Sequence, residues 1–259
     1  MPLITSRDNP LLKRLRKLLT SGSERREQGL IVLDGPHLLQ AYLQSHGATG
    51  VQVVVAQSSR RDDAEIVRLA DQVETVIEVG DALIGTLSPS NTPVGVVALA
   101  PMPVPSQRVA GDCVLIECVQ DPGNVGAILR TASAAGFSRV YLSTGCADVW
   151  SPKCLRGGMG AHFDLVMEER VDLARFVSEF TGDSVALDVR APDSVFDIAM
   201  GSPLAVVLGG EGAGLSPALL QAATRRCRIP MQGHAESLNV AVAAAIVMFE
   251  QVRRRTQRA

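Results

Sequence analysis

Apolar and polar residues alternate along the first hundred residues in a pattern that predicts a small α/β domain. Short apolar runs that predict strands lie at residues 30–34, 51–56, 74–79 and 94–100. Between them, residues 36–47 and 62–72 carry apolar side chains at helical spacing, and Gly47 is placed to end the first helix. Strands that alternate with helices in this way are typical of an α/β sheet.

The second half of the chain continues the alternation with different residues. Residues 113–119 predict a strand, residues 125–135 a helix that ends at Gly136, and residues 139–144 the next strand. This order is a βαβ unit. Further strands are expected at residues 163–168, 184–189, 203–208 and 227–231, and further helices at residues 172–180 and from residue 239 onward.

One segment, residues 101–107, interrupts both patterns with three prolines and is the expected linker. A chain of 259 residues, 46% of them hydrophobic, can form the cores of two modest domains, which we place at residues 1–104 and 105–259. No run approaches the roughly 18 apolar residues of a membrane span. Charges also interrupt the N-terminus where a signal peptide needs an apolar stretch. We therefore expect a cytoplasmic protein without a membrane partner.

Composition and charge narrow the classes of function. The five cysteines are scattered without the spacing of a metal site, so we expect free thiols and no metal. The net charge of −2 excludes a globally basic nucleic-acid binder. Locally, the first thirty residues hold seven cations against three acids, and a second basic group lies at Arg253, Arg254, Arg255 and Arg258. Each group, taken alone, is equally well explained as a solvated helix face.

The helix expected at residues 125–135 carries a single charge, Arg130. Its apolar residues fall on one stripe and Arg130 falls almost opposite, so the guanidinium does not face the sheet. The neighbours of Arg130 on that face are glycine and alanine, which leave room for a large ligand. An exposed surface arginine explains the same pattern, and a turn or a helix N-cap explains Asn124.

Two further loops follow expected strands. The loop LGGEGAGLSP, residues 208–217, has glycines where the backbone turns sharply or approaches a ligand, before a helix that Ser216 and Pro217 begin. It contains neither the dinucleotide fingerprint nor the Walker motif, which counts against an oxidoreductase and an NTPase. A place near a helix N-terminus is sufficient to explain Glu211.

The other loop, residues 229–239, leads into a helix that is apolar on every side. Ser237 or Asn239 is expected to cap this helix. Because such a helix needs burial all round, a partner subunit is its expected cover.

Together, the motifs DPGNVGAILRTASAAGF, LGGEGAGLSP and IPMQGHAESLNVAVAAAIVMFE resemble the three ordered motifs of the SpoU/TrmH family of RNA 2′-O-ribose methyltransferases, in the SPOUT superfamily. The resemblance covers residues 112–251 and is specific because three separate loops match. The segments SRDNPLLKRLRKLL, VLDGPHLL and NTPVGVVAL are similar to the ribosomal-protein-like substrate-binding domain that often precedes the catalytic domain. The resemblance implies a C-terminal α/β domain with a deep trefoil knot, preceded by a small α/β domain.

The resemblance also implies a cofactor, a partner and a substrate. S-adenosylmethionine, without a metal, is expected to lie in the knot against Leu208, Gly209, Gly210, Gly212, Ile229, Met231, Ser237 and Leu238. Family members are homodimers, which agrees with the apolar C-terminal helix. The expected substrate is structured RNA, with large-subunit rRNA favoured and tRNA as the alternative. The cations expected to bind it are Arg14, Arg16, Lys17, Lys153 and Arg156.

The implied reaction is attack of a ribose 2′-hydroxyl on the sulfonium methyl group. By resemblance Arg130 is the catalytic arginine, and the residues expected around it are Asn124, Glu211, Ser237 and Asn239. Because a guanidinium stays protonated, we expect Arg130 to hold an RNA phosphate and to orient the 2′-oxygen. Glu211 is expected to orient Arg130 through an ion pair. The proton acceptor stays open among a phosphate, Ser237 and Arg130.

Some residues depart from the usual wording of the family. Gly210 stands where many members have Asn or Ala, a change that should leave backbone contacts to the cofactor intact. Gly158 replaces a usual Ser, while Asp34 and Val94 replace a frequent Glu and Gln. A non-catalytic RNA-binding assembly factor with the same fold is the competing hypothesis. The complete set of five catalytic residues counts against it.

Overall fold

The computed structural model describes residues 3–88, 92–104 and 111–257, and its contacts divide the chain into two units. The first unit takes in Met1–Val104 and Asp148–Phe163, and the second takes in Pro105–Ala147 and Asp164–Ala259. The division expected from the sequence did not assign residues 148–163 to the N-terminal part. Residues 105–107 of the expected linker, and Arg258, lie outside the described residues.

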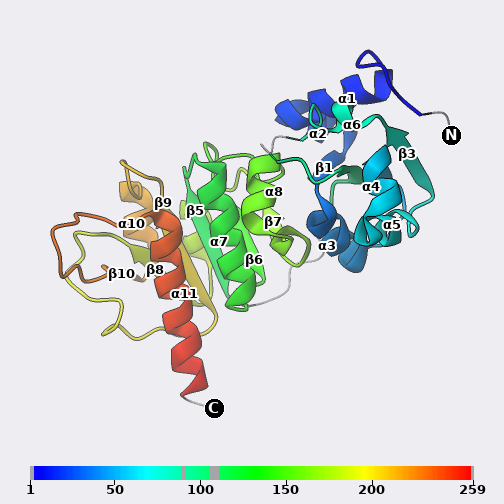
Figure 1. The fold of residues 1–259 in the computed structure, drawn as a ribbon. Coiled ribbons are helices and arrows are strands. Elements are labelled where there is room, and N and C mark those ends of the chain that lie inside the picture. Colours follow the sequence, from blue (N-terminus) through cyan, green and yellow to red (C-terminus); the bar gives the residue numbers. More distant parts are fainter. Residues whose placement is uncertain (1–2, 89–91, 105–110, 258–259) are drawn as a thin grey trace. The chain divides into compact units, whose positions relative to one another are not determined.

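A four-stranded sheet forms the centre of the first unit (Figure 1). Across the sheet the strands are β1 (Leu30–Asp34), β4 (Val96–Pro101), β2 (Gln52–Ala56) and β3 (Thr75–Val79). β4 pairs antiparallel with β1 and with β2, and β2 pairs parallel with β3. These strands confirm the four expected ones, although β4 begins only after Gly95, whose φ of +79° is a left-handed conformation.

The helices of the first unit are α1 (Pro10–Thr20), α2 (Gly22–Gln28), α3 (Pro36–His46), α4 (Gln57–Asp62), α5 (Ala64–Ala70), α6 (Asp81–Ile84) and α8 (Pro152–Gly158), with the 3₁₀ helix η1 (Ala161–Phe163). α1 begins after Asn9, whose side chain accepts a hydrogen bond from the backbone N–H of Leu11 at 2.9 Å. It buries Leu12, Leu15 and Leu18, one residue per turn. The basic N-terminal segment is therefore an amphipathic helix that packs on the sheet.

The segment 148–163 is anchored within the first unit by polar and aromatic contacts. A guanidinium nitrogen of Arg25, a buried residue, lies 2.6 Å from Oδ2 of Asp148. The rings of Tyr42 and Phe163 meet edge to face, with centroids 5.3 Å apart. A Cβ at Gly160 would lie 2.8 Å from that of Ala41, so this backbone approaches α3 closely. These contacts explain why residues 148–163 group with the N-terminal residues.

A six-stranded parallel sheet forms the second unit. Across the sheet the strands are β10 (Arg225–Cys227), β8 (Asp183–Leu187), β9 (Leu204–Gly209), β5 (Cys113–Glu117), β6 (Arg139–Leu142) and β7 (Val166–Glu168). The helices α7 (Pro122–Ala134) and α11 (Val240–Thr256) pack on each other, and α11 also packs on β9. The helices α9 (Leu173–Glu179) and α10 (Pro217–Ala222) share a core with the side chains of Cys113, Leu115, Ala205 and Val207.

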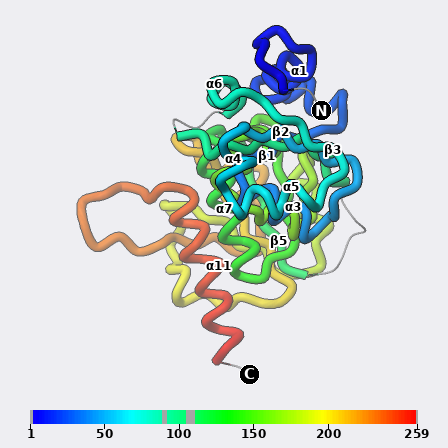
Figure 2. Tube along the Cα trace, turned by 45° about the vertical axis from the view of Figure 1, so that its right-hand side comes forward, coloured from blue at the N-terminus to red at the C-terminus, as the bar shows by residue number. Residues whose placement is uncertain are grey.

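Three boundaries in the second unit differ from expectation by three residues or more. α7 begins at Pro122 because the side chain of Asp121 accepts a hydrogen bond from the backbone N–H of Asn124 at 3.0 Å. Asn124 is thus a first-turn residue and not the cap. β10 spans only Arg225–Cys227, because the chain leaves the sheet after pairing with β8 and enters the loop 228–239, orange in Figure 2. The expected strand at 163–168 is reduced to β7 because η1 occupies its start.

The C-terminal helix α11 is covered by this chain on one side. Asn239 is its cap, and its Oδ1 accepts hydrogen bonds from the backbone N–H groups of Ala241 at 2.9 Å and Val242 at 3.4 Å. Ala244, Val247 and Met248 are fully buried, whereas the side chains of Val242 and Phe249 are 49% and 48% exposed. The exposed apolar side is the part that an expected partner would have to cover.

The basic end of α11 is used inside the fold. Glu250 is buried and accepts hydrogen bonds from Arg253 at 2.7 and 2.8 Å and from Arg254 at 2.6 Å. Arg254 also donates to the backbone carbonyl of Phe196 at 2.9 Å, and Arg255 pairs with the buried Asp112. The basic group at Arg253, Arg254 and Arg255 therefore serves mainly to stabilise the fold.

Candidate functional site

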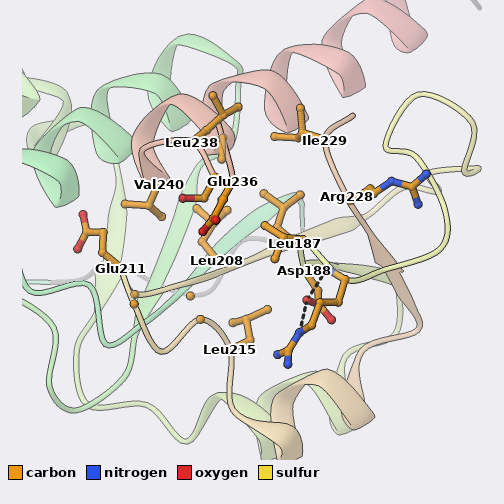
Figure 3. Close-up of a pocket in the computed structure, with 18 of the residues that line it drawn as sticks. Leu187, Asp188, Leu208, Glu211, Leu215, Arg228, Ile229, Glu236, Leu238 and Val240 are labelled. Atoms are coloured by element: carbon orange, nitrogen blue, oxygen red, sulfur yellow. Dashed lines mark hydrogen bonds and ion pairs between the residues drawn. The ribbon is translucent and has the colours of Figure 1, made fainter. Parts of the chain in front are cut away.

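A pocket of about 840 Å³ opens in the second unit at the carboxyl ends of β8, β9 and β10 (Figure 3). Residues 187–190 after β8, 208–215 after β9, and most of residues 227–240 after β10 line it. Ligands of open parallel sheets bind outside the carboxyl ends of the strands, so the pocket lies where the fold places a ligand. The side chains of Leu208, Ile229 and Leu238 give it apolar surface.

The glycine loop is shaped by close backbone contacts. A Cβ on Gly209 would lie 2.4 Å from the carbonyl carbon of Gly214, and one on Gly210 would lie 2.3 Å from the carbonyl oxygen of Cys118. The backbone N–H of Gly214 donates to the carbonyl of Gly210 at 3.0 Å and closes the loop. A side chain at position 210 would therefore meet the backbone at the end of β5, which accounts for the glycine at this position in this chain.

The residues expected to hold the cofactor all line this pocket: Leu208, Gly209, Gly210, Gly212, Ile229, Met231, Ser237 and Leu238. Cys227 lines it too, but burial raises the pKa of its thiol to about 12, so the thiol stays neutral. It is a packing residue and not a nucleophile.

Three of the expected catalytic residues meet, one from each motif. The side-chain amide of Asn124 donates to Oε1 of Glu211, and its Oδ1 accepts from Nδ2 of Asn239 at 3.0 Å. Because Asn239 also caps α11, this network ties the start of α7 to the glycine loop and to the start of α11. Glu211 and Ser237 line the pocket as well.

Arg130 lies apart from this network. It is exposed on α7, six residues after Asn124, which places it about 240° around the helix axis from the amide. It is not among the residues that line the pocket. Within the described part of the chain no ion pair joins Glu211 to Arg130, and the carboxylate of Glu211 accepts from Asn124. The expected ion pair between Glu211 and Arg130 is thus not present.

Apart from Arg130, the cations expected to bind RNA are all in the first unit. Arg14, Lys17, Lys153 and Arg156 are exposed, and Arg16 is half-buried, donating to the carbonyl of Arg7 at 2.9 Å. Arg25, from the same basic segment as Arg14, is buried in its ion pair with Asp148 and is a structural residue.

Sequence reasoning missed the pocket wall formed by residues 187–190. Asp188 and Arg190 lie in it, and Nε of Arg190 is 3.6 Å from Oδ1 of Asp188. The signal was present, since Asp188 stands near the end of an expected strand, where parallel sheets bind ligands. It was overlooked because no glycine or family motif marks it.

Neither a metal centre nor a membrane span is found where the structure describes the chain. No three potential metal-ligating side chains gather among residues 3–88, 92–104 and 111–257. Over the same ranges, no helix has the length and hydrophobicity to cross a bilayer.

His162 is buried, which lowers its pKa to about 4, and its ring lies 2.9 Å from the carbonyl oxygen of Val149. It is a packing residue.

A parallel sheet with a glycine-lined pocket at the carboxyl ends of its strands belongs to the class of α/β proteins that bind a ligand at that edge of the sheet. Comparison with known proteins identifies the family. Residues 113–249 match the SpoU rRNA methylase family, and residues 9–98 match the MRM3-like substrate binding domain. The chain belongs to the SpoU rRNA methylase family.

Relatives cover nearly the whole chain. The 23S rRNA (guanosine(2553)-2′-O)-methyltransferase RlmP of Bacillus subtilis is 34% identical over 257 residues, which are 96% of this chain and 98% of that protein. A solved RNA 2′-O ribose methyltransferase superposes with a TM-score of 0.85 at 31% identity, covering 98% of this chain and 100% of the other. The methyltransferase AviRb of Streptomyces viridochromogenes, solved in complex with the cofactor AdoMet, has a TM-score of 0.85 at 27% identity, with 96% and 98% covered.

Proposed function

We propose that this protein transfers a methyl group from S-adenosylmethionine to a ribose 2′-hydroxyl of large-subunit rRNA. The observation that carries the proposal is the hydrogen-bonded network of Asn124, Glu211 and Asn239 beside a pocket that all the expected cofactor residues line. RlmP, a relative over almost the full length of the chain, is by name a 23S rRNA 2′-O-methyltransferase. The MRM3-like substrate binding domain agrees with an RNA substrate.

The pocket fits S-adenosylmethionine. Its apolar side chains suit the adenine, and the backbone at Gly212 and Gly214, where a Cβ would meet nothing within 4 Å, lets a flat ring or a ribose approach the main chain. When bound, this cofactor supplies a methyl group on a positively charged sulfur. The chain's own contribution is to orient the acceptor and to keep the loops after β9 and β10 in place through Asn124 and Asn239.

Arg130 is proposed to act on the RNA and not on the cofactor. Its guanidinium is exposed and lies outside the pocket of its own chain. An arginine in that position can bind a backbone phosphate bidentately and fix the ribose next to it. Ser237, which lines the pocket, is proposed to contact the reacting ribose or the cofactor.

The finer architecture is also part of the proposal. We propose that the loops 208–215 and 228–239 form a deep trefoil knot, which is supported by the way both border one pocket before α11 returns to pack on α7. We propose a homodimer through α11, supported by the exposed Val242 and Phe249. Residues 1–104 are proposed as the RNA-binding domain, with Arg14, Arg16 and Lys17 as phosphate contacts. Lys153 and Arg156, in the segment 148–163 that groups with these residues, are proposed as further phosphate contacts. The cytoplasm is proposed as the compartment.

The test is methyl transfer to RNA. Purified protein is given radiolabelled S-adenosylmethionine with either 23S rRNA or tRNA from a strain that lacks the protein, and 2′-O-methylated nucleotides are mapped. We expect one methylated ribose in 23S rRNA and at least a 100-fold lower rate for Arg130→Ala, the order of loss for a positioned charge contact. Arg226→Ala, at an exposed arginine outside the pocket, is the matched control and should keep the wild-type rate. Methylation of tRNA alone would identify tRNA, and not rRNA, as the substrate. A protein that binds no S-adenosylmethionine at all would instead favour a non-catalytic assembly factor.

A further inference from the structure

The pocket wall that follows β8 has no counterpart in the three motifs. Residues 187–190 contribute it from the carboxyl end of β8, beside the loops that follow β9 and β10. Figure 3 shows Asp188 in this wall, joined to a guanidinium by a dashed line. An acidic side chain here needs a reason, because a buried carboxylate is costly unless it is hydrogen-bonded.

Asp188 is held in one orientation. Its backbone N–H donates to the carbonyl of Cys227 at 2.9 Å, and its Oδ1 accepts from the backbone N–H of Arg190 at 3.0 Å. The side chain of Asp188 is only 12% exposed. Among the described residues no group donates to the other oxygen, Oδ2. A fixed acceptor with free capacity therefore borders the pocket.

The other charged groups of the pocket differ from Asp188. Glu211 already accepts from Asn124, and Glu236 is exposed on the loop after β10. The guanidinium of Arg228 is engaged by the carbonyl of Ala191 at 2.7 Å. Asp188 is thus the half-buried carboxylate that the wall presents to a ligand.

We propose that Asp188 binds the ribose hydroxyl groups of the cofactor, an inference that rests on the proposed function. A carboxylate only accepts hydrogen bonds, and a vicinal diol offers two donors close together. Carboxylates near strand ends bind ribose hydroxyls in dinucleotide enzymes by the same chemistry. The guanidinium of Arg190, whose side chain is 82% exposed, partly offsets the charge of Asp188, which favours neutral hydroxyl donors over the cofactor's ammonium group. The neighbouring Leu187 and Leu208 provide apolar surface for the attached base.

The test is a comparison of ligands and variants by titration calorimetry. The ligands are S-adenosylhomocysteine, its 2′-deoxy analogue, and 5′-methylthioadenosine, which keeps the ribose but lacks the amino acid. The variants are Asp188→Asn, whose amide oxygen can still accept from Arg190, and Asp197→Asn, a control at an exposed acid nearby. Unfolding temperatures check that each variant is folded, and Asp188→Ser replaces the Asn variant if that one is unstable.

We expect Asp188→Asn to weaken the binding of S-adenosylhomocysteine and of 5′-methylthioadenosine roughly 10- to 100-fold, the range of a hydrogen bond to a charged group. The affinity for the 2′-deoxy analogue should fall much less, and Asp197→Asn should leave the affinity for all three ligands unchanged. An equal loss for the 2′-deoxy analogue, or no loss at all, overturns the inference. A loss that disappears with 5′-methylthioadenosine would assign Asp188 to the ammonium group and also overturns it. If the wild type binds none of the three ligands, the proposed cofactor site fails together with the inference.

Discussion

Replacing Gly209 by alanine should open the glycine loop. The added Cβ would lie 2.4 Å from the carbonyl carbon of Gly214, 2.6 Å from its oxygen and 2.6 Å from the nitrogen of Leu215. All three are backbone atoms that cannot rotate away, so the loop has to move by about 1 Å to reach ordinary contact distance. Gly209 has no positive φ, which leaves this steric conflict as the reason for the effect.

The magnitude follows from two terms. Overpacking costs about 1–3 kcal/mol, and loss of the 3.0 Å hydrogen bond from Gly214 to Gly210 adds about 1 kcal/mol. A loss of about 2–4 kcal/mol lowers the unfolding temperature of a unit this size by roughly 5–15 °C. Because the loop is a wall of the pocket, binding of S-adenosylhomocysteine should weaken by at least about tenfold.

Differential scanning calorimetry and titration calorimetry measure both effects. Gly233→Ala is the matched control, since a Cβ at Gly233 meets nothing within 4 Å and Gly233 does not line the pocket. Its unfolding temperature and affinity should equal those of the wild type. If Gly209→Ala unfolds within a degree or two of the wild type and binds as tightly, the close approach of the two backbone segments is not real.

Three further predictions concern other contacts. Asn239→Ala should cost about 1 kcal/mol of stability in chemical denaturation through the lost cap, whereas Asn239→Asp should keep the cap and lose methyl transfer, because it cannot donate to Asn124. Hydrogen bonds from Arg253 lower the pKa of Glu250 to about 2, so the stabilisation that its charge provides is complete above about pH 4.5 and is lost as the pH falls toward 2. Glu250→Gln should therefore make the unfolding temperature depend less on pH between about pH 4.5 and 2. A variant with the pH profile of the wild type would contradict this prediction. Asp148→Asn should destabilise the first unit by about 2–4 kcal/mol, since it leaves the guanidinium of Arg25 buried without its counter-charge, and a urea midpoint equal to that of the wild type would show that the pair contributes little.

Local signals carried the predictions that succeeded. Most strands of both sheets follow apolar runs, although β10 (Arg225–Cys227) does not. The helix starts at Ser216 and Asn239 were predicted from side chains that can satisfy free N–H groups of the first turn. Asn124 was ambiguous for the same reason, because Asp121, three residues earlier, is as good a cap and is the residue used. Motif membership predicted residues that line the pocket, among them the glycines from 209 to 214.

Contacts between distant residues explain what was missed. Asp148 pairs with Arg25, 123 positions away, and no local pattern announces such a pair, so residues 148–163 were assigned to the catalytic half. The segment lies inside the 113–249 match to the methylase family and yet packs with the N-terminal residues. Lys153 and Arg156 therefore lie in the same unit as Arg14 and Lys17, so that, apart from Arg130 in the second unit, one unit holds the cations proposed to bind RNA.

For Arg130, helix geometry and motif membership predict different positions relative to Asn124. A motif groups Asn124 and Arg130 because they are close in sequence, but six residues of helix turn them to different sides. The structure accordingly joins Asn124 to Glu211 and Asn239, while Arg130 stays exposed. We therefore propose two tasks for this helix, in which its first turn organises the pocket and its exposed face holds the RNA. Loss of Arg130 should therefore impair RNA methylation while leaving the affinity for S-adenosylhomocysteine unchanged, and loss of Asn124 should impair both.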